Sequence, residues 1–145
     1  MTPKHLGKQS VIPTEPSIDI LDVVPNPHPI SNYVVRFICP EMNSICPATG
    51  SPDFATLIID YNPAGMLVES KSLKLYLSSY RNHRSFHEDC TVQIGKDIYT
   101  VPQPRWLRIS GLWRVRGGIS INVFWQSDEA PRELYIPELP IAGLN

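Results

Sequence analysis

The residues with the clearest chemical potential lie in the loop from Ser44 to Phe54, which holds a cysteine and an acid. Cys46 stands in a segment constrained by prolines and glycine, and Asp53 follows seven residues later at the mouth of a β-prone run. A thiol in a fixed loop near a carboxylate is the arrangement of a nucleophile with a nearby acid. The alternative is that Cys46 is a small buried apolar residue and Asp53 a turn residue.

A second group of polar side chains lies in residues 69–90. At about 100° per residue, an apolar stripe and a cationic stripe fall on opposite faces of a helix. A charged helix face is most often simply solvated, so the pattern alone assigns it no ligand. The apolar stripe consists of Leu73, Tyr76, Leu77 and Tyr80, and the opposite face holds Lys71, Lys74, Ser78 and Arg81.

The end of this stretch predicts a second helix. Asn82 is a poor residue for a helix interior, so the first helix is expected to break there. Ser85 and Glu88 then form a capping-box pattern that starts the next helix, which gives Glu88 a structural explanation as a cap.

Three potential metal ligands also lie here. His83, His87 and Cys90 are spaced four and three residues apart, so on one continuous helix they could bind a metal ion. The predicted break between residues 82 and 85 separates His83 from the other two, so no metal site is expected.

Length and composition limit the kinds of protein this can be. The chain has 145 residues, 42% of them hydrophobic, which suits one domain with a real core. A net charge of −1 argues against nucleic-acid binding and against an anionic membrane surface. The chain has no run of about 18 apolar residues and no apolar signal segment at its amino terminus. Three cysteines fit a reducing compartment, so a cytoplasmic protein is expected.

The elements that must position these residues form one α+β domain. Residues 33–38 and 54–61 predict two β-strands that precede the helices. Residues 105–116 predict a third strand, and residues 119–125 a fourth that returns after the Gly117–Gly118 turn. The order β-β-α-α-β-β predicts a four-stranded antiparallel sheet with both helices on one face.

Proline-rich ends flank this domain. Residues 1–30 are expected to form an extended arm, residues 31–125 the single domain, and residues 126–145 a tail that wraps around it. Apolar residues from Ile18 to Val24 indicate that the arm lies against its own domain or a neighbouring subunit, and the sequence does not decide which. A four-stranded sheet has two exposed edges, which predicts an oligomer.

Four separated motifs resemble one family, the NADPH-dependent nitrile reductases that convert 7-cyano-7-deazaguanine to 7-aminomethyl-7-deazaguanine, in their short single-module form. The resemblance covers residues 31–125. The motifs are Cys-Pro-Ala-Thr-Gly-Ser-Pro-Asp-Phe-Ala at 46–55, Val-Glu-Ser-Lys-Ser-Leu-Lys-Leu-Tyr at 68–76, Phe-His-Glu-Asp-Cys at 86–90 and Arg-Gly-Gly-Ile-Ser at 116–120.

The resemblance implies roles for individual residues in a queuosine-pathway reaction that serves tRNA modification. It implies that the Cys46 thiolate adds to the nitrile carbon as a thioimide, that Asp53 shuttles a proton, and that two NADPH molecules complete the reduction. It also implies that His87 is catalytic as well as substrate-binding, since it could orient the reacting nitrogen or the base. The substrate-binding positions by resemblance are Val68, Glu69, Ser70, His87 and Glu88.

The cofactor site implied by the resemblance is not a Rossmann site, because the chain has no Gly-x-Gly-x-x-Gly turn. The family has the tunnelling fold and assembles paired pentameric rings with active sites between chains. Basic residues favour the 2′-phosphate of NADPH. The implied cofactor-binding positions are Ser70, Lys71, Lys74, Arg81, Arg116 and Gly117.

Two other functions stay open at this point. One is a zinc-dependent purine or pterin hydrolase of the same broad fold, with ligands drawn from Cys39, Cys46, His87 and Cys90. The other is a ring-forming protein that binds a purine or pterin on Glu88 without catalysis. That second alternative leaves the pairing of Cys46 with Asp53 without a purpose.

Overall fold

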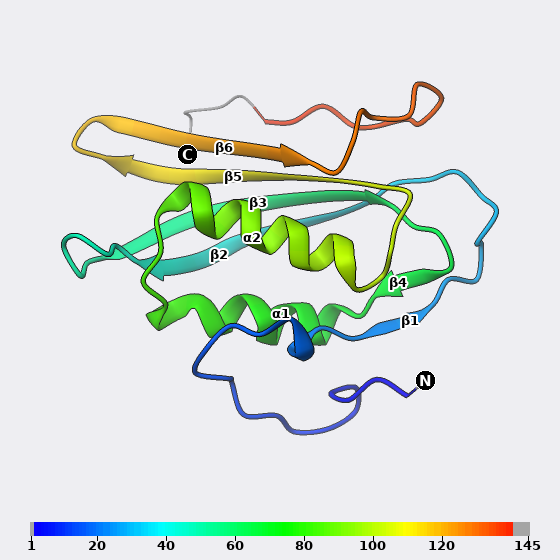
Figure 1. Ribbon diagram of the computed structural model, residues 1–145, viewed down its shortest axis with the longest axis horizontal. Coiled ribbons are helices and arrows are strands. Elements are labelled where there is room, and N and C mark those ends of the chain that lie inside the picture. The colour runs from blue at the N-terminus through cyan, green and yellow to red at the C-terminus, as the bar shows by residue number, and fades with distance from the viewer. Residues whose placement is uncertain (1, 141–145) are drawn as a thin grey trace.

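The computed structural model describes residues 2–140 and confirms the predicted α+β class (Figure 1). Four antiparallel strands form a sheet in the order β2-β3-β5-β6, and both helices pack on the same face of it. No helix among these residues is long and apolar enough to cross a membrane. The elements are β1 (Val23–Pro25), β2 (Val35–Ile45), β3 (Pro52–Asn62), β4 (Met66–Val68), α1 (Ser70–Ser78), α2 (His87–Thr100), β5 (Trp106–Arg116), β6 (Ile119–Gln126) and the short 3-10 helices η1 (Ile18–Ile20) and η2 (Ser79–Asn82).

The first strand is longer than the sequence predicts. The predicted strand ended before Pro40, whereas β2 continues to Ile45. A register shift between Cys39 and Met42 places an irregularity at the proline. Proline is tolerated at such a bulge and on an edge strand, and β2 is an edge strand of this sheet. The extension carries the chain to the far end of the sheet, next to Cys46.

The core fills the space between the sheet and the two helices. Alternate residues of β3 and β5, such as Leu57, Ile59 and Ile109, are fully buried against residues of α2 such as Ile94. Helix α2 approaches β5 and β6 closely at Gly95, where a Cβ atom would lie 2.7 Å from Ile109 and 2.8 Å from Trp125. Glycine at this position lets the helix lie directly on the sheet.

The helices agree with the predicted faces, and one predicted cap is wrong. The apolar stripe of α1 and η2 is buried in the core, and the break after Asn82 is confirmed. Helix α2 begins at His87, with Phe86 at the N-cap and no side-chain cap. Ser85 contacts Asp89 Oδ2 at 3.3 Å, so the predicted capping box with Glu88 does not form.

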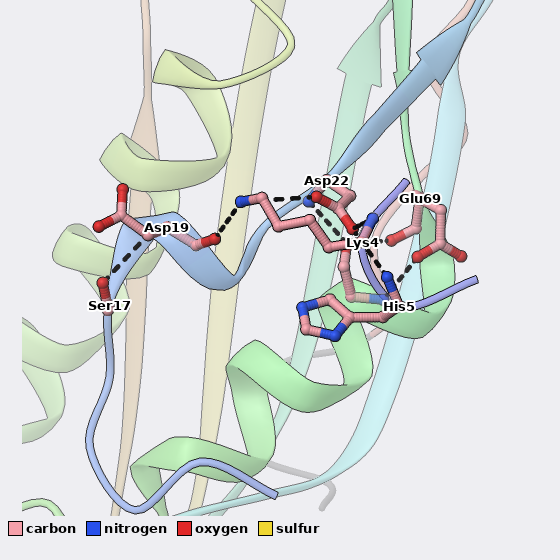
Figure 2. Close-up of polar contacts among 7 residues, drawn as sticks. Lys4, His5, Ser17, Asp19, Asp22 and Glu69 are labelled. Atoms are coloured by element: carbon pink, nitrogen blue, oxygen red, sulfur yellow. Dashed lines mark hydrogen bonds and ion pairs between the residues drawn. The ribbon is translucent and has the colours of Figure 1, made fainter. Parts of the chain in front are cut away.

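The amino-terminal arm lies on its own chain. Strand β1 pairs with β4, and Leu21 is part of the core. Figure 2 shows how the start of the arm is held, with the backbone N–H groups of Lys4 and His5 donating to Asp22 Oδ2 at 2.6 and 3.3 Å. Asp22 N–H in turn donates to Ser72 Oγ of α1 at 2.9 Å. The arm is therefore bonded to the first turn of α1.

The described part of the tail also contacts the sheet. Arg36 of β2 donates to the buried carboxylate of Asp60 and to the carbonyl oxygens of Pro137 and Glu138. Leu134 is buried. Residues 141–145 of the predicted tail lie outside the described residues, and the domain boundaries at 31 and 125 stay predictions.

Candidate active site

The end of β2 fixes the position of Cys46. Ile45 N–H donates to the carbonyl of His83 at 2.9 Å, and Ser85 N–H donates back to the carbonyl of Ile45 at 3.1 Å. The segment that links the two helices therefore pairs with the last residue of β2. This pairing brings the thiol loop to the start of α2, although 40 residues separate them in sequence.

The thiol loop itself is a closed turn. Cys46 N–H donates to the carbonyl of Ser51, and Gly50 N–H donates to the carbonyl of Cys46, both at 2.9 Å. Gly50 has φ of +71°, a left-handed conformation that favours glycine. The loop predicted to hold the cysteine rigidly does so through these two bonds.

The loop also lowers the pKa of its cysteine. The Thr49 hydroxyl is the largest cause, followed by backbone N–H groups of Thr49 and Ala48, and the Arg116 guanidinium adds a smaller contribution. Together they bring the pKa of Cys46 to about 7. About half of the thiol is then ionised at neutral pH, compared with a few per cent for an ordinary cysteine.

The other two cysteines have the opposite environment. Burial raises the pKa of Cys39 to about 11 and that of Cys90, which also lies near Asp89, to about 12. Both thiols are thus protonated at neutral pH and poor nucleophiles. The described structure therefore singles out Cys46 as the reactive thiol.

Asp53 connects the thiol loop to β5 and α2. Its side chain is 3% exposed, and Arg116 Nη1 donates to Oδ1. His87 Nε2 lies 3.0 Å from Oδ2. A buried carboxylate requires partners of this kind because an unpaired buried charge is costly. The carboxylate predicted to act with Cys46 is thus held between a cation and an imidazole.

The imidazole of His87 is also held on its flat face. It stacks on the indole of Trp113, with ring centroids 4.3 Å apart and planes 3° from parallel. Burial lowers the pKa of His87, and the neighbouring Glu88 carboxylate opposes that shift. The lowered pKa favours the neutral imidazole, and the contact of Nε2 with the Asp53 carboxylate favours the tautomer with its proton on Nε2.

These groups surround one small pocket of about 130 Å³ at the end of the sheet. Five residues predicted from the sequence meet there, namely Cys46, Asp53, His87, Glu88 and Arg116. Two apolar lining residues, Phe86 and Ile121, were not predicted as site residues. Phe86 lies within the motif at 86–90 and is 61% exposed, which is unusual for a large apolar side chain.

Three of the predicted substrate-binding residues lie elsewhere in the chain. Glu69 is buried before α1, where its carboxylate accepts the N–H groups of Lys71 and Ser72, both at 2.8 Å. Val68 is buried in β4, and Ser70 begins α1. Figure 1 shows the start of α1 beside β4, whereas Cys46 follows the opposite end of the sheet. A single chain does not bring the two groups together.

Three of the six predicted cofactor residues line a second and larger pocket. A groove of about 450 Å³ runs between α1 and β2, and Ser70, Lys74 and Arg81 lie along it. Lys71 Nζ donates to the carbonyl of Lys8 in the arm. Gly117 is not in the groove, because it lies with Arg116 at the exposed β5–β6 hairpin.

The arrangement of ligands for the zinc alternative is absent from the described chain. Residues 2–140 contain no group of three or more His, Cys, Asp or Glu side chains placed to hold a metal ion. Cys39 and Cys90 do not line the pocket that contains Cys46 and His87.

The fold and this pocket define a class of protein, an antiparallel α+β protein with an acidic thiol beside a buried carboxylate. Residues 52–132 match the model of the QueF-like protein family. A protein of Zymomonas mobilis described as an NADPH-dependent 7-cyano-7-deazaguanine reductase is 57% identical over 138 residues, which cover 95% of this chain and 94% of that protein. The chain belongs to this reductase family, and the resemblance noted in the sequence is confirmed.

Further relatives carry the same description. The proteins of Methylorubrum extorquens strain PA1 and Parvibaculum lavamentivorans are 55% and 54% identical over 139 residues, 96% of this chain and 91% and 90% of their own lengths. A solved structure, the apo form of an archaeosine synthase QueF-Like, matches with a TM-score of 0.64 over 70% of this chain and 99% of that one. At 22% identity it supports the fold alone.

Proposed function

We propose that this chain reduces the nitrile of 7-cyano-7-deazaguanine to an aminomethyl group with NADPH, in queuosine biosynthesis. The printed descriptions of the relatives support this substrate and cofactor. One structural observation carries the mechanism: a cysteine whose pKa is lowered to about 7 shares a pocket with the buried carboxylate of Asp53. That pair suits addition of sulfur to an electrophilic carbon and delivery of a proton.

In the first step the Cys46 thiolate attacks the nitrile carbon. A carbon–sulfur bond forms, one π bond of the nitrile breaks, and its electron pair moves to nitrogen. Asp53 passes the proton lost from the thiol to that nitrogen, which gives a neutral thioimide. His87 Nε2, 3.0 Å from Asp53 Oδ2, lies where it can return a proton to the carboxylate. Arg116 keeps Asp53 in place throughout.

The thioimide then has to accept four electrons in all. Bound NADPH supplies two electrons as hydride, so two molecules are needed for each nitrile. Once the thioimide carbon has accepted the first hydride, the carbon–sulfur bond breaks, the Cys46 thiolate leaves and an imine remains. The second hydride reduces this imine to the amine, and until then water would hydrolyse it. The small volume of the pocket and its apolar residues Phe86 and Ile121 favour exclusion of water.

The carboxylates of Glu88 and Glu69 are the proposed groups that bind the deazaguanine base. Glu88 lines the pocket and is exposed in this chain, so its acceptor oxygens are available to the N–H groups of a deazaguanine. We propose that Glu69, with Val68 and Ser70, comes from a neighbouring chain, since these residues lie at the far end of the same subunit. The active site is then shared between two copies.

The groove between α1 and β2 is the proposed NADPH site, because its side chains include cations and a hydroxyl that can donate hydrogen bonds to phosphate groups. Lys74 and Arg81 line it together with Ser70, and apolar residues of β2 form much of the remainder. Cations at this position suit the phosphates, the 2′-phosphate included. Lys71 on the same helix, with Arg116 and Gly117 at the β5–β6 hairpin, completes the proposed set. Arg116 also lines the thiol pocket, which supports a cofactor that reaches from the groove to that pocket.

The proposed assembly is a pair of pentameric rings in the cytoplasm. Both outer strands of the sheet, β2 and β6, have an unpaired edge within residues 2–140. Ile38, Phe54 and Phe124 are 63%, 52% and 54% exposed, and strand alternation places them on the face away from the helices. An exposed apolar face of this kind supports association with further copies.

The reaction is tested by its stoichiometry. Purified protein incubated with limiting 7-cyano-7-deazaguanine is expected to oxidise two NADPH molecules per nitrile and to yield the primary amine, and Cys46→Ala is expected to abolish both. Release of ammonia or a carboxylic acid without NADPH oxidation would instead indicate a hydrolase.

A further inference from the structure

Trp113 lies directly behind the catalytic pocket without lining it. Its side chain is fully buried, and its indole covers one face of the His87 ring at 4.3 Å with the planes 3° from parallel. A terminal torsion such as χ2 of histidine is broad and has no sharp preference of its own. The stack therefore supplies an orientation that the His87 side chain does not have by itself.

Trp113 is in turn anchored to the backbone that carries His87. Its indole Nε1 donates to Thr91 Oγ1 at 3.0 Å, and the Thr91 hydroxyl donates to the carbonyl of His87 at 2.7 Å. Thr91 is fully buried on α2, one turn after His87. The ring stacking and the two hydrogen bonds thus link Trp113, Thr91 and His87 in a closed set of contacts.

Gly111 in strand β5 leaves just enough room for these contacts. At Gly111 a Cβ atom would lie 2.5 Å from Thr91 Oγ1 and 3.1 Å from Trp113 Nε1. Any side chain there would displace the hydroxyl or the indole. Gly111 is therefore part of the same arrangement, although it does not line the pocket.

We infer that Trp113, anchored by the Thr91 hydroxyl, is a positioning residue that fixes the plane of the His87 imidazole so that Nε2 faces Asp53. The inference rests on the proposed function, because it assigns His87 and Asp53 to proton transfer in that reaction. His87 lines the pocket and Trp113 does not, so Trp113 acts only through His87. Its effect belongs to the rate of the chemical steps and not to cofactor binding.

Two substitutions at position 91 separate the hydroxyl from the volume of the side chain. Thr91→Ser keeps the hydroxyl and loses a methyl group, whereas Thr91→Val keeps the shape and loses the hydroxyl. We expect Thr91→Ser to retain kcat within about twofold and Thr91→Val to lose about tenfold in kcat, with KM for NADPH unchanged in both. Both are compared with wild-type protein whose turnover has first been established, so failure of the proposed reaction is recognised separately.

Thr91→Val also leaves the indole N–H buried without an acceptor, which lowers stability for a reason unrelated to positioning. The double variant Thr91→Val/Trp113→Phe removes both partners and is expected to regain stability in denaturant unfolding. Its kcat is expected to stay about tenfold low because the anchored indole is gone. Recovery of kcat along with stability, or an equal loss of kcat in Thr91→Ser, would overturn the inference and leave Trp113 as a core residue.

Discussion

The reactivity of this protein is concentrated in one of its three thiols. Cys46 has a pKa of about 7, whereas burial raises the pKa of Cys39 to about 11 and of Cys90 to about 12. A thiolate reacts far faster than a thiol, so one cysteine per chain is expected to react at neutral pH. Because Thr49 is the largest cause of the lowered pKa, the selectivity depends on a hydroxyl three residues away.

Thr49→Ala is expected to raise the pKa of Cys46 toward its ordinary value of about 8.5. Removal of the hydroxyl takes away a donor to the thiolate, so a higher pH is needed to ionise the sulfur. The rate of alkylation by iodoacetamide, followed by intact mass between pH 5.5 and pH 9.5, reports this directly. The midpoint is expected near the pKa of about 7 in the wild type and more alkaline in the variant.

Thr49→Ser is the matched control, because it keeps the hydroxyl. Its alkylation midpoint is expected to stay with the wild type. If Thr49→Ala and the wild type share one midpoint, the Thr49 hydroxyl does not set the thiol pKa.

The sequence predicts the proposed reacting groups better than the residues that change their pKa or orientation. Cys46 and Asp53 are proposed as nucleophile and acid because few residue types can take those roles. Thr49 has no such signature, since a threonine in a loop is common. Trp113 reads as an inward-facing residue of a strand, and nothing local indicates that it stacks on His87, which lies 26 residues earlier.

At the scale of elements, the position of α2 sets the geometry of the pocket. His87 and Glu88 lie in its first turn, and Gly95 two turns later is a point of close approach to the sheet. The contact at Gly95 therefore helps to position His87 and Glu88, although it lies two turns away from them on α2.

Gly95→Ala is expected to destabilise the fold by about 1–3 kcal/mol, because the added methyl overlaps Ile109 at 2.7 Å and Trp125 at 2.8 Å. In an exposed helix the same change would stabilise by about 1 kcal/mol. The sign of the change in unfolding free energy, measured with urea, therefore shows whether position 95 is tightly packed against the sheet or behaves like an exposed helix position. Lys96→Ala, at the exposed neighbouring position, is the control and is expected to change stability little.

Element boundaries show where local patterns mislead. A strand was expected to end at Pro40, yet β2 continues because the sheet edge and a bulge tolerate the missing N–H. The Ser85–Glu88 pattern predicted a cap, yet Ser85 N–H is used to pair with Ile45. In both cases a long-range contact decides what the local sequence leaves open.

At the scale of the whole molecule, the proposed site is incomplete in one chain. The pocket with Cys46 and the segment with Glu69 lie at opposite ends of the same subunit. Closed assemblies bring different surfaces of one chain into contact with each other, which provides a way to join them.

Co-expression of two inactive variants tests this sharing. Cys46→Ala and Glu69→Gln are each expected to be inactive, whereas mixed assemblies contain sites with an intact Cys46 from one chain and an intact Glu69 from the next. Random mixing gives about a quarter of the wild-type activity per site, because each contribution is intact half of the time.

The matched control pairs Cys46→Ala with Asp53→Asn. Both residues belong to the pocket of one chain, so mixing is expected to restore nothing. If the first pair also fails in assemblies shown by mass to contain both variants, the site is not shared.

The global arrangement could be predicted because alternation of apolar residues and the glycine turn fix strand pairing. The two pockets could not be predicted from the sequence, since each depends on which ends of β2, α1 and α2 lie next to one another. The contacts of the amino-terminal arm could likewise not be predicted from the sequence. Its apolar residues indicated burial, and only the structure shows that Leu21 enters the core of its own chain.

Formation of a covalent adduct on Cys46 is the most direct test of the whole account. The protein is incubated with 7-cyano-7-deazaguanine without NADPH, and its intact mass is compared with that of Cys46→Ala. We expect the wild type to gain the mass of the entire nitrile, the variant to gain nothing, and added NADPH to remove the adduct. An adduct that persists in Cys46→Ala, or none in a wild type that turns over, would contradict the thioimide mechanism.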